Sequence, residues 1–167
     1  VENTDQRSKD YSDLAHAFRP GHADFTYTEK YGNRDYRGGG RSSGRETLGR
    51  VIAGAFAKMA LRQYGIKVDA AVVGVGEVSC SDYQWNPPFL PPLYAPECKE
   101  KEKMLALIEE ARRDGDSIGS TVECVIQGVP AGLGSPVFDK LDAVLAHGIF
   151  SLGAVKGFEI GNGFMAA

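Results

Sequence analysis

The sequence predicts an α/β layered fold, because helix-like and strand-like segments alternate along most of its 167 residues. The segment after residue 43 repeats apolar side chains every three or four positions, as a helix does. Residues 66–78 are rich in β-branched side chains, and residues 121–127 alternate polar with apolar ones, as strands do. A single domain over residues 1–167 is expected, because this length suffices for one compact core.

Three helices are expected. The first begins at Ser43, where Ser43 and Glu46 have the spacing of a capping box, in which each side chain binds the other residue's backbone N–H. It ends at Gly65, a residue type that tolerates the left-handed conformation common at helix ends. The second covers roughly residues 97–113. The third is expected to open at residues 135–136, where a serine cap precedes a proline suited to the first turn.

The remaining segments read as strands and a loop. Residues 66–78 predict one buried strand, and residues 121–127 predict a strand with one apolar face. Residues 155–160 predict a last strand. Residues 84–98 contain five prolines, which lack the backbone N–H and restrain their neighbours, so this stretch is a proline-rich loop insertion.

Composition excludes several classes of protein. The net charge of −3 argues against a general binder of nucleic acid or anionic membranes. Every long apolar run is interrupted, so no membrane span is expected, and the start of the chain lacks the apolar stretch of a signal peptide. Three widely spaced cysteines without a C-x-x-C pair suggest neither a zinc site nor a disulfide framework, which fits a reducing, cytoplasmic setting. They are Cys80, Cys98 and Cys124.

The strongest functional signal is a run of arginines around a glycine triplet. Arginine grips phosphate or carboxylate with a planar fork, and residues 38–40 let the backbone approach a ligand closely. A helix start follows, with unpaired N–H groups and partial positive charge. These features predict an anion site, although a solvated basic loop would share the charge pattern. The arginines are Arg19, Arg34, Arg37, Arg41, Arg45 and Arg50.

Other readings of this region remain open. His22 lies in the segment R-P-G-H-A-D and is suited to proton transfer, because histidine titrates near neutral pH. A lone loop histidine is more often structural. The segment R-G-G-G-R is similar to RNA-binding tracts, but it is single and adjoins a strong helix. Nucleic-acid binding is therefore not expected.

Two long stretches resemble the chorismate synthase family. Residues 18–56, FRPGHADFTYTEKYGNRDYRGGGRSSGRETLGRVIAGAF, resemble its signature region, and residues 3–12, NTDQRSKDYS, its lead-in. Residues 123–164, ECVIQGVPAGLGSPVFDKLDAVLAHGIFSLGAVKGFEIGNGF, are similar to its second long motif. These motifs occur in the family's order and spacing. The chain therefore resembles the central part of such a protein, without the family's N- and C-terminal segments.

The resemblance implies a lyase of the shikimate pathway, which makes chorismate for aromatic amino-acid biosynthesis. The family eliminates phosphate and a ring proton from 5-enolpyruvylshikimate 3-phosphate in an anti-1,4 sense. Reduced FMN is required. Members of the family that reduce their own flavin also use NADP. By position, Arg41, Ser42 and Ser43 would contact FMN, and Arg19 and Arg45 would bind anionic groups of the substrate.

The same resemblance gives His22 a role beside the flavin, as a proton donor to it. It implies a β-α-β sandwich, with long helices packed between antiparallel sheets, and a homotetramer when the protein is full length. The absent segments carry a further active-site histidine and other contacts in the family. A non-catalytic flavin- or anion-binding fragment of the same fold is therefore the alternative to an active enzyme.

Overall fold

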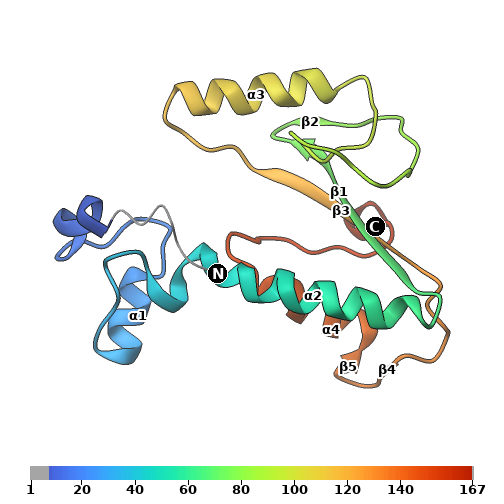
Figure 1. Cartoon of the computed structure of the whole chain (residues 1–167), viewed down its shortest axis with the longest axis horizontal. Helices are drawn as coiled ribbons and strands as arrows, with labels where there is room; N and C mark the ends of the chain where they lie inside the picture. Colours follow the sequence, from blue (N-terminus) through green and yellow to red (C-terminus); the bar gives the residue numbers. More distant parts are fainter. Residues whose placement is uncertain (1–7, 167) are drawn as a thin grey trace. The chain divides into compact units, whose positions relative to one another are not determined.

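The structure is a computed structural model that describes residues 8–166, and its internal contacts divide the chain into two compact units (Figure 1). The first comprises Val1–Ala55 and Gly132–Ala167, and the second comprises Phe56–Ala131. Whether the chain folds as a single domain stays a prediction. Among the described residues, no helix is both long and apolar enough to cross a membrane.

The first unit is built mainly from helices. A short antiparallel pair, β4 with β5, precedes helix α4. The helix α2 begins in this unit and continues into the second. The elements of the first unit are the 3-10 helices η1 (Ser8–Leu14), η2 (Gly40–Ser42), η3 (Gly44–Glu46) and η4 (Gly163–Ala166), the helices α1 (Asp24–Tyr31), α2 (Thr47–Arg62) and α4 (Leu141–Phe150), and the strands β4 (Gly134–Ser135) and β5 (Asp139–Lys140).

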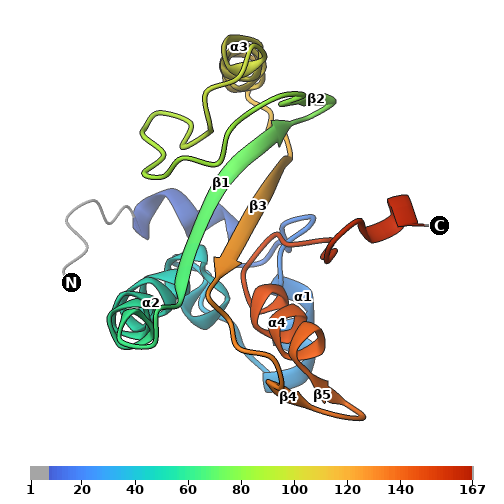
Figure 2. The same cartoon turned by 90° about the vertical axis from the view of Figure 1, so that its right-hand side faces the viewer.

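The second unit is a small antiparallel sheet with one helix. Strand β1 (Lys67–Val75) lies between β2 (Val78–Ser79) and β3 (Ser120–Gln127), and Figure 2 shows β1 and β3 running side by side. Helix α3 (Lys101–Arg113) packs against β1 and β2. Mixed helices and antiparallel sheets confirm the predicted fold class.

The core of the second unit explains why its proline-rich loop is ordered. Met104 of α3 is 0% exposed and packs with Val75 of β1. Leu93 and Ala95, from the predicted loop 84–98, are buried in the same cluster. The loop also joins the sheet, because the backbone N–H of Val72 donates to the Tyr94 carbonyl at 3.1 Å. The proline-rich loop is therefore part of the hydrophobic core of this unit and covers it.

The helix predicted from Ser43 to Gly65 is confirmed, but its start differs in detail. A turn of 3-10 helix, η3, precedes α2. The Ser43 Oγ accepts from the Arg45 backbone N–H at 3.3 Å, while Glu46 Oε1 accepts from Arg41 Nη1 at 3.3 Å. The reciprocal capping box is therefore wrong, because the tighter 3-10 turn brings a nearer N–H to the serine and leaves Glu46 to the arginine.

The predicted end of this helix is confirmed. Gly65 has φ +75°, and its N–H donates to the Arg62 carbonyl at 3.1 Å. The Ile66 N–H reaches back to the Leu61 carbonyl at 3.1 Å. This pair of bonds is the Schellman motif, which satisfies carbonyls that the last turn would leave unpaired.

Three predictions about strands and helix starts are wrong. Residues 66–78 form a hairpin rather than one strand, because Gly76, at φ +57°, turns the chain between β1 and β2. The helix expected to open at residues 135–136 instead starts at Leu141, since Ser135 pairs with Asp139 in the β4–β5 ladder. Residues 155–160 form no strand, because they have no ladder partner among the described residues.

The cysteine prediction is also wrong. Cys80 and Cys98 form a disulfide, with their Cα atoms 5.7 Å apart. They are 18 positions apart in the sequence, so no short motif indicates the pair. The β1–β2 hairpin and the start of α3 bring them together. Cys124, in β3, has a free thiol.

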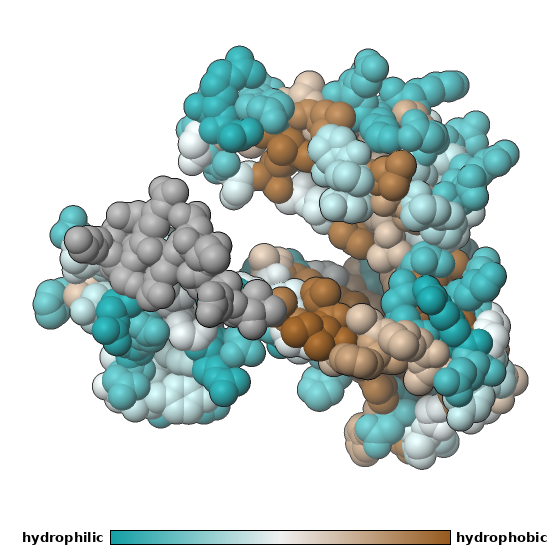
Figure 3. All heavy atoms as spheres, viewed as in Figure 1, coloured by the Kyte–Doolittle hydropathy of each residue, from teal (hydrophilic) through white to brown (hydrophobic). Residues whose placement is uncertain are grey.

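Several apolar side chains that the sequence places on inner faces are exposed. Along α2 these are Val51, Ile52, Phe56 and Met59, and Figure 3 shows hydrophobic residues gathered over this helix. On β3, the predicted apolar face carries Val122, which is 59% exposed. The apolar periodicity therefore marks faces that nothing in the described part of the chain covers.

Met104→Ala should destabilise the protein by about 2–5 kcal/mol, because it removes a fully buried side chain and leaves a cavity. Urea unfolding followed by circular dichroism measures this free energy. Leu90→Ala is the matched control, since Leu90 is largely exposed, and it should change stability by less than about 0.5 kcal/mol. Equal effects of the two substitutions would contradict this core.

Candidate functional site

The predicted site residues all lie in the first unit, and a buried carboxylate organises their N-terminal part. Asp24, in the first turn of α1, is 1% exposed. Its Oδ2 accepts from the backbone N–H of Arg19 at 3.0 Å and from Arg19 Nε at 2.9 Å. Its Oδ1 accepts from Arg19 Nη2 at 3.0 Å. This forked pairing closes the turn 19–24 onto the start of α1.

A second arginine completes the cluster. Arg34 Nη1 lies 3.7 Å from Asp24 Oδ2, and the Arg34 side chain is only 8% exposed. Its Nη2 donates to the carbonyls of Leu14 at 2.5 Å and Ala17 at 2.6 Å. Arg34 Cζ also lies 5.4 Å from the centroid of the Phe18 ring. Arg34 therefore ties the end of η1 to α1, and it is a structural residue here.

These contacts set the charge state of the cluster. Hydrogen bonding from Arg19 holds the pKa of the Asp24 carboxyl far below its usual range, against the opposing effect of burial. The same bond raises the pKa of Arg19 above that of an ordinary arginine. Asp24 is therefore a carboxylate and both arginines are cations at every physiological pH. Two positive charges face one negative charge, which leaves the cluster with a net positive charge.

His22 sits at the tip of the turn that Asp24 closes. Its side chain is exposed, and its Nδ1 lies 3.0 Å from the Pro20 carbonyl oxygen. Because a carbonyl only accepts, Nδ1 carries the hydrogen in this contact. The other ring nitrogen, Nε2, is then left to accept a proton or, in the imidazolium, to donate one. The geometry suits a proton-transfer residue, although it does not assign that role.

The glycine triplet, residues 38–40, forms a tight turn before α2 and has no side chains of its own. Gly38, Gly39 and Gly40 all have positive φ, at +146°, +87° and +49°. A Cβ at residue 39 would lie 3.3 Å from the Ser42 Oγ and from the Ser43 backbone nitrogen, so only glycine fits without strain. The Ser42 Oγ donates to the Gly39 carbonyl at 2.6 Å. Arg41, Ser42 and Ser43 are thereby presented together at the start of the helix.

The six arginines between residues 19 and 50 divide into two groups. Arg19, Arg34 and Arg50 have internal partners; Arg50 donates to the Ser151 carbonyl at 2.8 Å and so binds the end of α4. Arg37, Arg41 and Arg45 are exposed, and the Arg41 side chain is 85% accessible, with Glu46 as its ion-pair partner at 3.3 Å. Three of these six guanidinium groups are therefore engaged within the chain, so the number of arginines alone overestimates the strength of an anion site.

Sequence reasoning missed the residues that position this site. The sequence pattern gives Asp24 no role and includes Arg34 only as one arginine of the predicted anion site, yet both contact the turn 19–24. The available signal was an acid five residues after an arginine, at the start of a helical segment. That spacing allows one turn to bring the two charges together. Glu46 was assigned to the cap, yet it pairs with Arg41.

Asp24→Asn should destabilise the protein by about 3–5 kcal/mol at pH 7, because it leaves two buried or half-buried guanidinium groups without a counter-charge. The native pKa of Asp24 is depressed, so its contribution is complete above the unfolded pKa of about 3.9 and is lost as pH falls toward the native pKa. The stability difference between wild type and variant should therefore be constant near neutral pH and shrink below about pH 4.

Urea titrations at several pH values measure this difference. Asp35→Asn is the matched control, since Asp35 pairs with Arg37 at 3.7 Å and both side chains are exposed. Its effect should stay below about 1 kcal/mol. A stability difference for Asp24→Asn that does not change on acidification would contradict the assigned charge state.

The whole chain matches a family model. Residues 1–167 match the model described as chorismate synthase. Among solved structures, a crystal structure of chorismate synthase matches 86% of this chain with a TM-score of 0.72 and 33% sequence identity. The match covers 48% of that protein, so the chain spans about half the length of its solved relative. The sequence motifs, the fold and both comparisons agree: this chain belongs to the chorismate synthase family.

Proposed function

We propose that the protein carrying this chain is a chorismate synthase in activity as well as in family. It would eliminate phosphate from 5-enolpyruvylshikimate 3-phosphate and give chorismate, with reduced FMN as its cofactor. The observation that carries the proposal is the match of the complete chain to the family model. The three residues Arg41–Ser43 at the start of the helix also support the proposal, because the resemblance to the family implies flavin contacts at these positions.

The residues present fit a phosphorylated flavin. Arg41 is an exposed cation, and the three glycines before it carry no side chains of their own. Added Cβ atoms at Gly38 and Gly44 would meet no atom within 4 Å, so there is room for a ligand beside this turn. Ser42 and Ser43 offer hydroxyl groups at the same place. We therefore propose that Arg41, Ser42 and Ser43 contact FMN.

The substrate is an anion, and two arginines are proposed to bind it. Asp24 receives the Nε and Nη2 hydrogens of Arg19, so Nη1 is the edge that we assign to a substrate phosphate or carboxylate. Arg45 follows the serine pair in η3, and its guanidinium is the second proposed contact. Such contacts would stabilise negative charge that gathers on the departing phosphate.

His22 is the proposed proton-transfer residue. The Pro20 carbonyl orients its ring through Nδ1, and Nε2 would hold the proton that His22 donates to the flavin. Reduced FMN, when bound, would supply an electron-rich ring beside the substrate without net oxidation or reduction. Arg19 and Arg45 would orient the anion and balance its charge, and His22 would hold the proton.

The wider setting follows from the same family. We propose a cytoplasmic enzyme of aromatic amino-acid biosynthesis that works as a homotetramer, with NADP only if it reduces its own flavin. The second candidate is a fragment that binds flavin or anions without catalysis, and it is favoured by the chain's 48% coverage of its solved relative. Turnover by the whole protein separates the two.

Arg41→Ala should weaken FMN binding about tenfold or more, because a hydrogen bond to a charged group contributes about 1.5–3 kcal/mol. Flavin fluorescence titration, with and without 5-enolpyruvylshikimate 3-phosphate, measures the dissociation constant. Arg113→Ala is the control, an arginine of the last turn of α3 in the other unit, and it should leave binding unchanged. Equal affinity of the Arg41 variant and wild type would remove Arg41 from the flavin site.

His22→Ala should lower kcat about 10²–10⁴-fold in the whole protein and leave its unfolding midpoint unchanged, since the ring is exposed and makes one hydrogen bond. His147→Ala, a histidine in the last turn of α4, is the control and should retain activity. Loss of folding in the His22 variant would instead show that the residue is structural.

A further inference from the structure

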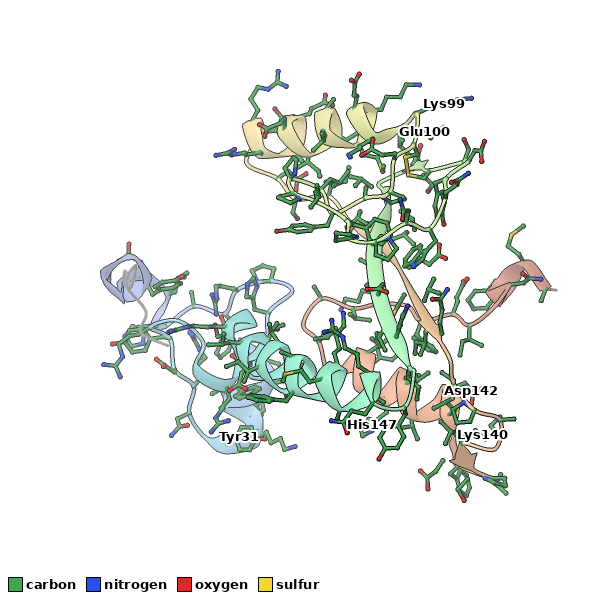
Figure 4. All side chains as sticks on the ribbon, turned by 45° about the vertical axis from the view of Figure 1, so that its right-hand side comes forward. Tyr31, Lys99, Glu100, Lys140, Asp142 and His147 are labelled. Atoms are coloured by element: carbon green, nitrogen blue, oxygen red, sulfur yellow. A yellow bond between two sulfur atoms is a disulfide. The ribbon has the colours of Figure 1, made fainter. Side chains whose placement is uncertain are left out.

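The disulfide of the second unit has a third polar group beside it. The sulfurs of Cys80 and Cys98 and a carboxylate oxygen of Glu100 all lie within 4.8 Å of one another. Figure 4 shows the disulfide next to Glu100, before the first turn of α3. All three residues are half-buried. Neither the family signature nor the proposed reaction uses them.

We propose that this cluster binds Zn²⁺ when the disulfide is reduced. Two thiolates and a carboxylate are ligands that Zn²⁺ accepts, at about 2.3 Å for sulfur and 2.0–2.2 Å for oxygen. A tetrahedral ion at those distances keeps its ligand atoms roughly 4 Å apart, so the two sulfurs would separate after reduction, and the carboxylate oxygen already lies within 4.8 Å of both. Water would take the fourth position, as it does at zinc sites with three protein ligands.

The backbone around the three ligands is held in place without the disulfide. The N–H of Cys80 donates to the Val73 carbonyl at 2.8 Å, which extends the β1–β2 hairpin. The Cys98 carbonyl accepts from the Lys101 N–H at 3.3 Å. Both cysteines also pack against the core around Met104. Reduction therefore frees the sulfurs while their backbones stay close.

The carboxylate is oriented by a neighbour. The Ser81 Oγ donates to Glu100 Oε1 at 2.7 Å, and the Ser81 N–H approaches Oε2 at 3.4 Å. Hydrogen bonds of this kind fix ligand carboxylates at metal sites and strengthen binding. The N-terminal end of α3 adds a field that favours the thiolate of Cys98, since a helix N-terminus stabilises negative charge. Lys99 contributes a positive charge beside it.

The change from the disulfide to the zinc-bound dithiolate is balanced in electrons and protons. A dithiol reductant breaks the Sγ–Sγ bond, giving two electrons and two protons to the cysteines and itself becoming a disulfide. Zn²⁺ then forms two Zn–S bonds and releases two thiol protons to solvent. The ion would replace the covalent link between the end of β2 and the start of α3. It would thus hold the proline-rich loop, with Leu93 and Ala95, on the core.

Co²⁺ is the spectroscopic probe for this site. The chain is reduced with a phosphine, the reductant is removed without oxygen, and Co²⁺ is added. We expect one equivalent to give the near-ultraviolet thiolate-to-cobalt absorption, and Zn²⁺ to abolish it by displacement. Ser81→Ala should weaken binding about 10–100-fold, and Glu100→Gln at least as much. Glu109→Gln, a carboxylate later in α3, is the control and should bind as wild type.

A measurement on the unaltered chain guards against variants that fail to fold. Zn²⁺ should protect Cys80 and Cys98 of the reduced chain from alkylation, while Cys124 stays reactive as an internal reference. Absence of the thiolate absorption, or equal alkylation of all three cysteines with and without Zn²⁺, would overturn the proposal. Unchanged affinity in Glu100→Gln would also overturn it. These readouts require no flavin, substrate or turnover, so the proposed enzymatic function can fail without affecting them.

Discussion

One buried carboxylate organises the part of the chain that carries the candidate site. Asp24 takes a forked pair of hydrogen bonds and a backbone N–H from Arg19, and Arg34 Nη1 lies 3.7 Å from the same Oδ2. A buried charge without partners would cost several kcal/mol, so the carboxylate and its arginines are held together. His22 lies on the turn that this pairing closes. The proposed proton-transfer residue is therefore positioned by an ion pair whose arginine keeps one edge, Nη1, for the proposed substrate contact.

The arginine-rich segment combines two different uses of the same residue type. Arg34 and Arg50 satisfy backbone carbonyls at the ends of η1 and α4, where helices leave acceptors unpaired. Arg41 instead extends from a turn of positive-φ glycines into solvent. The local charge available to the proposed phosphorylated cofactor is thus smaller than the arginine count suggests. The binding contribution rests on fewer side chains, each held by a defined backbone.

The second unit depends on the closure of its proline-rich loop. The sheet is small, and α3 alone would leave the end of β1 open to solvent. Leu93 and Ala95 fill that space, and the link between Cys80 and Cys98 holds the two ends of the loop together. Closing a loop restricts the unfolded chain, which is one way such a link stabilises a small core. The cluster with Glu100 lies where this closure is made.

The sequence by itself determined the family, through its two long motifs. It also determined the long helix with its glycine end, the strand at residues 121–127 and the open glycine turn, because these follow from local periodicity and backbone preference. Tertiary structure alone decided the rest. The pairing of Cys80 with Cys98, the hairpin within residues 66–78 and the ladder that displaces the start of α4 depend on contacts between separated segments. The partition of the arginines follows the same rule: a guanidinium takes whichever carboxylate or carbonyl the fold brings within reach, and local sequence does not specify that partner.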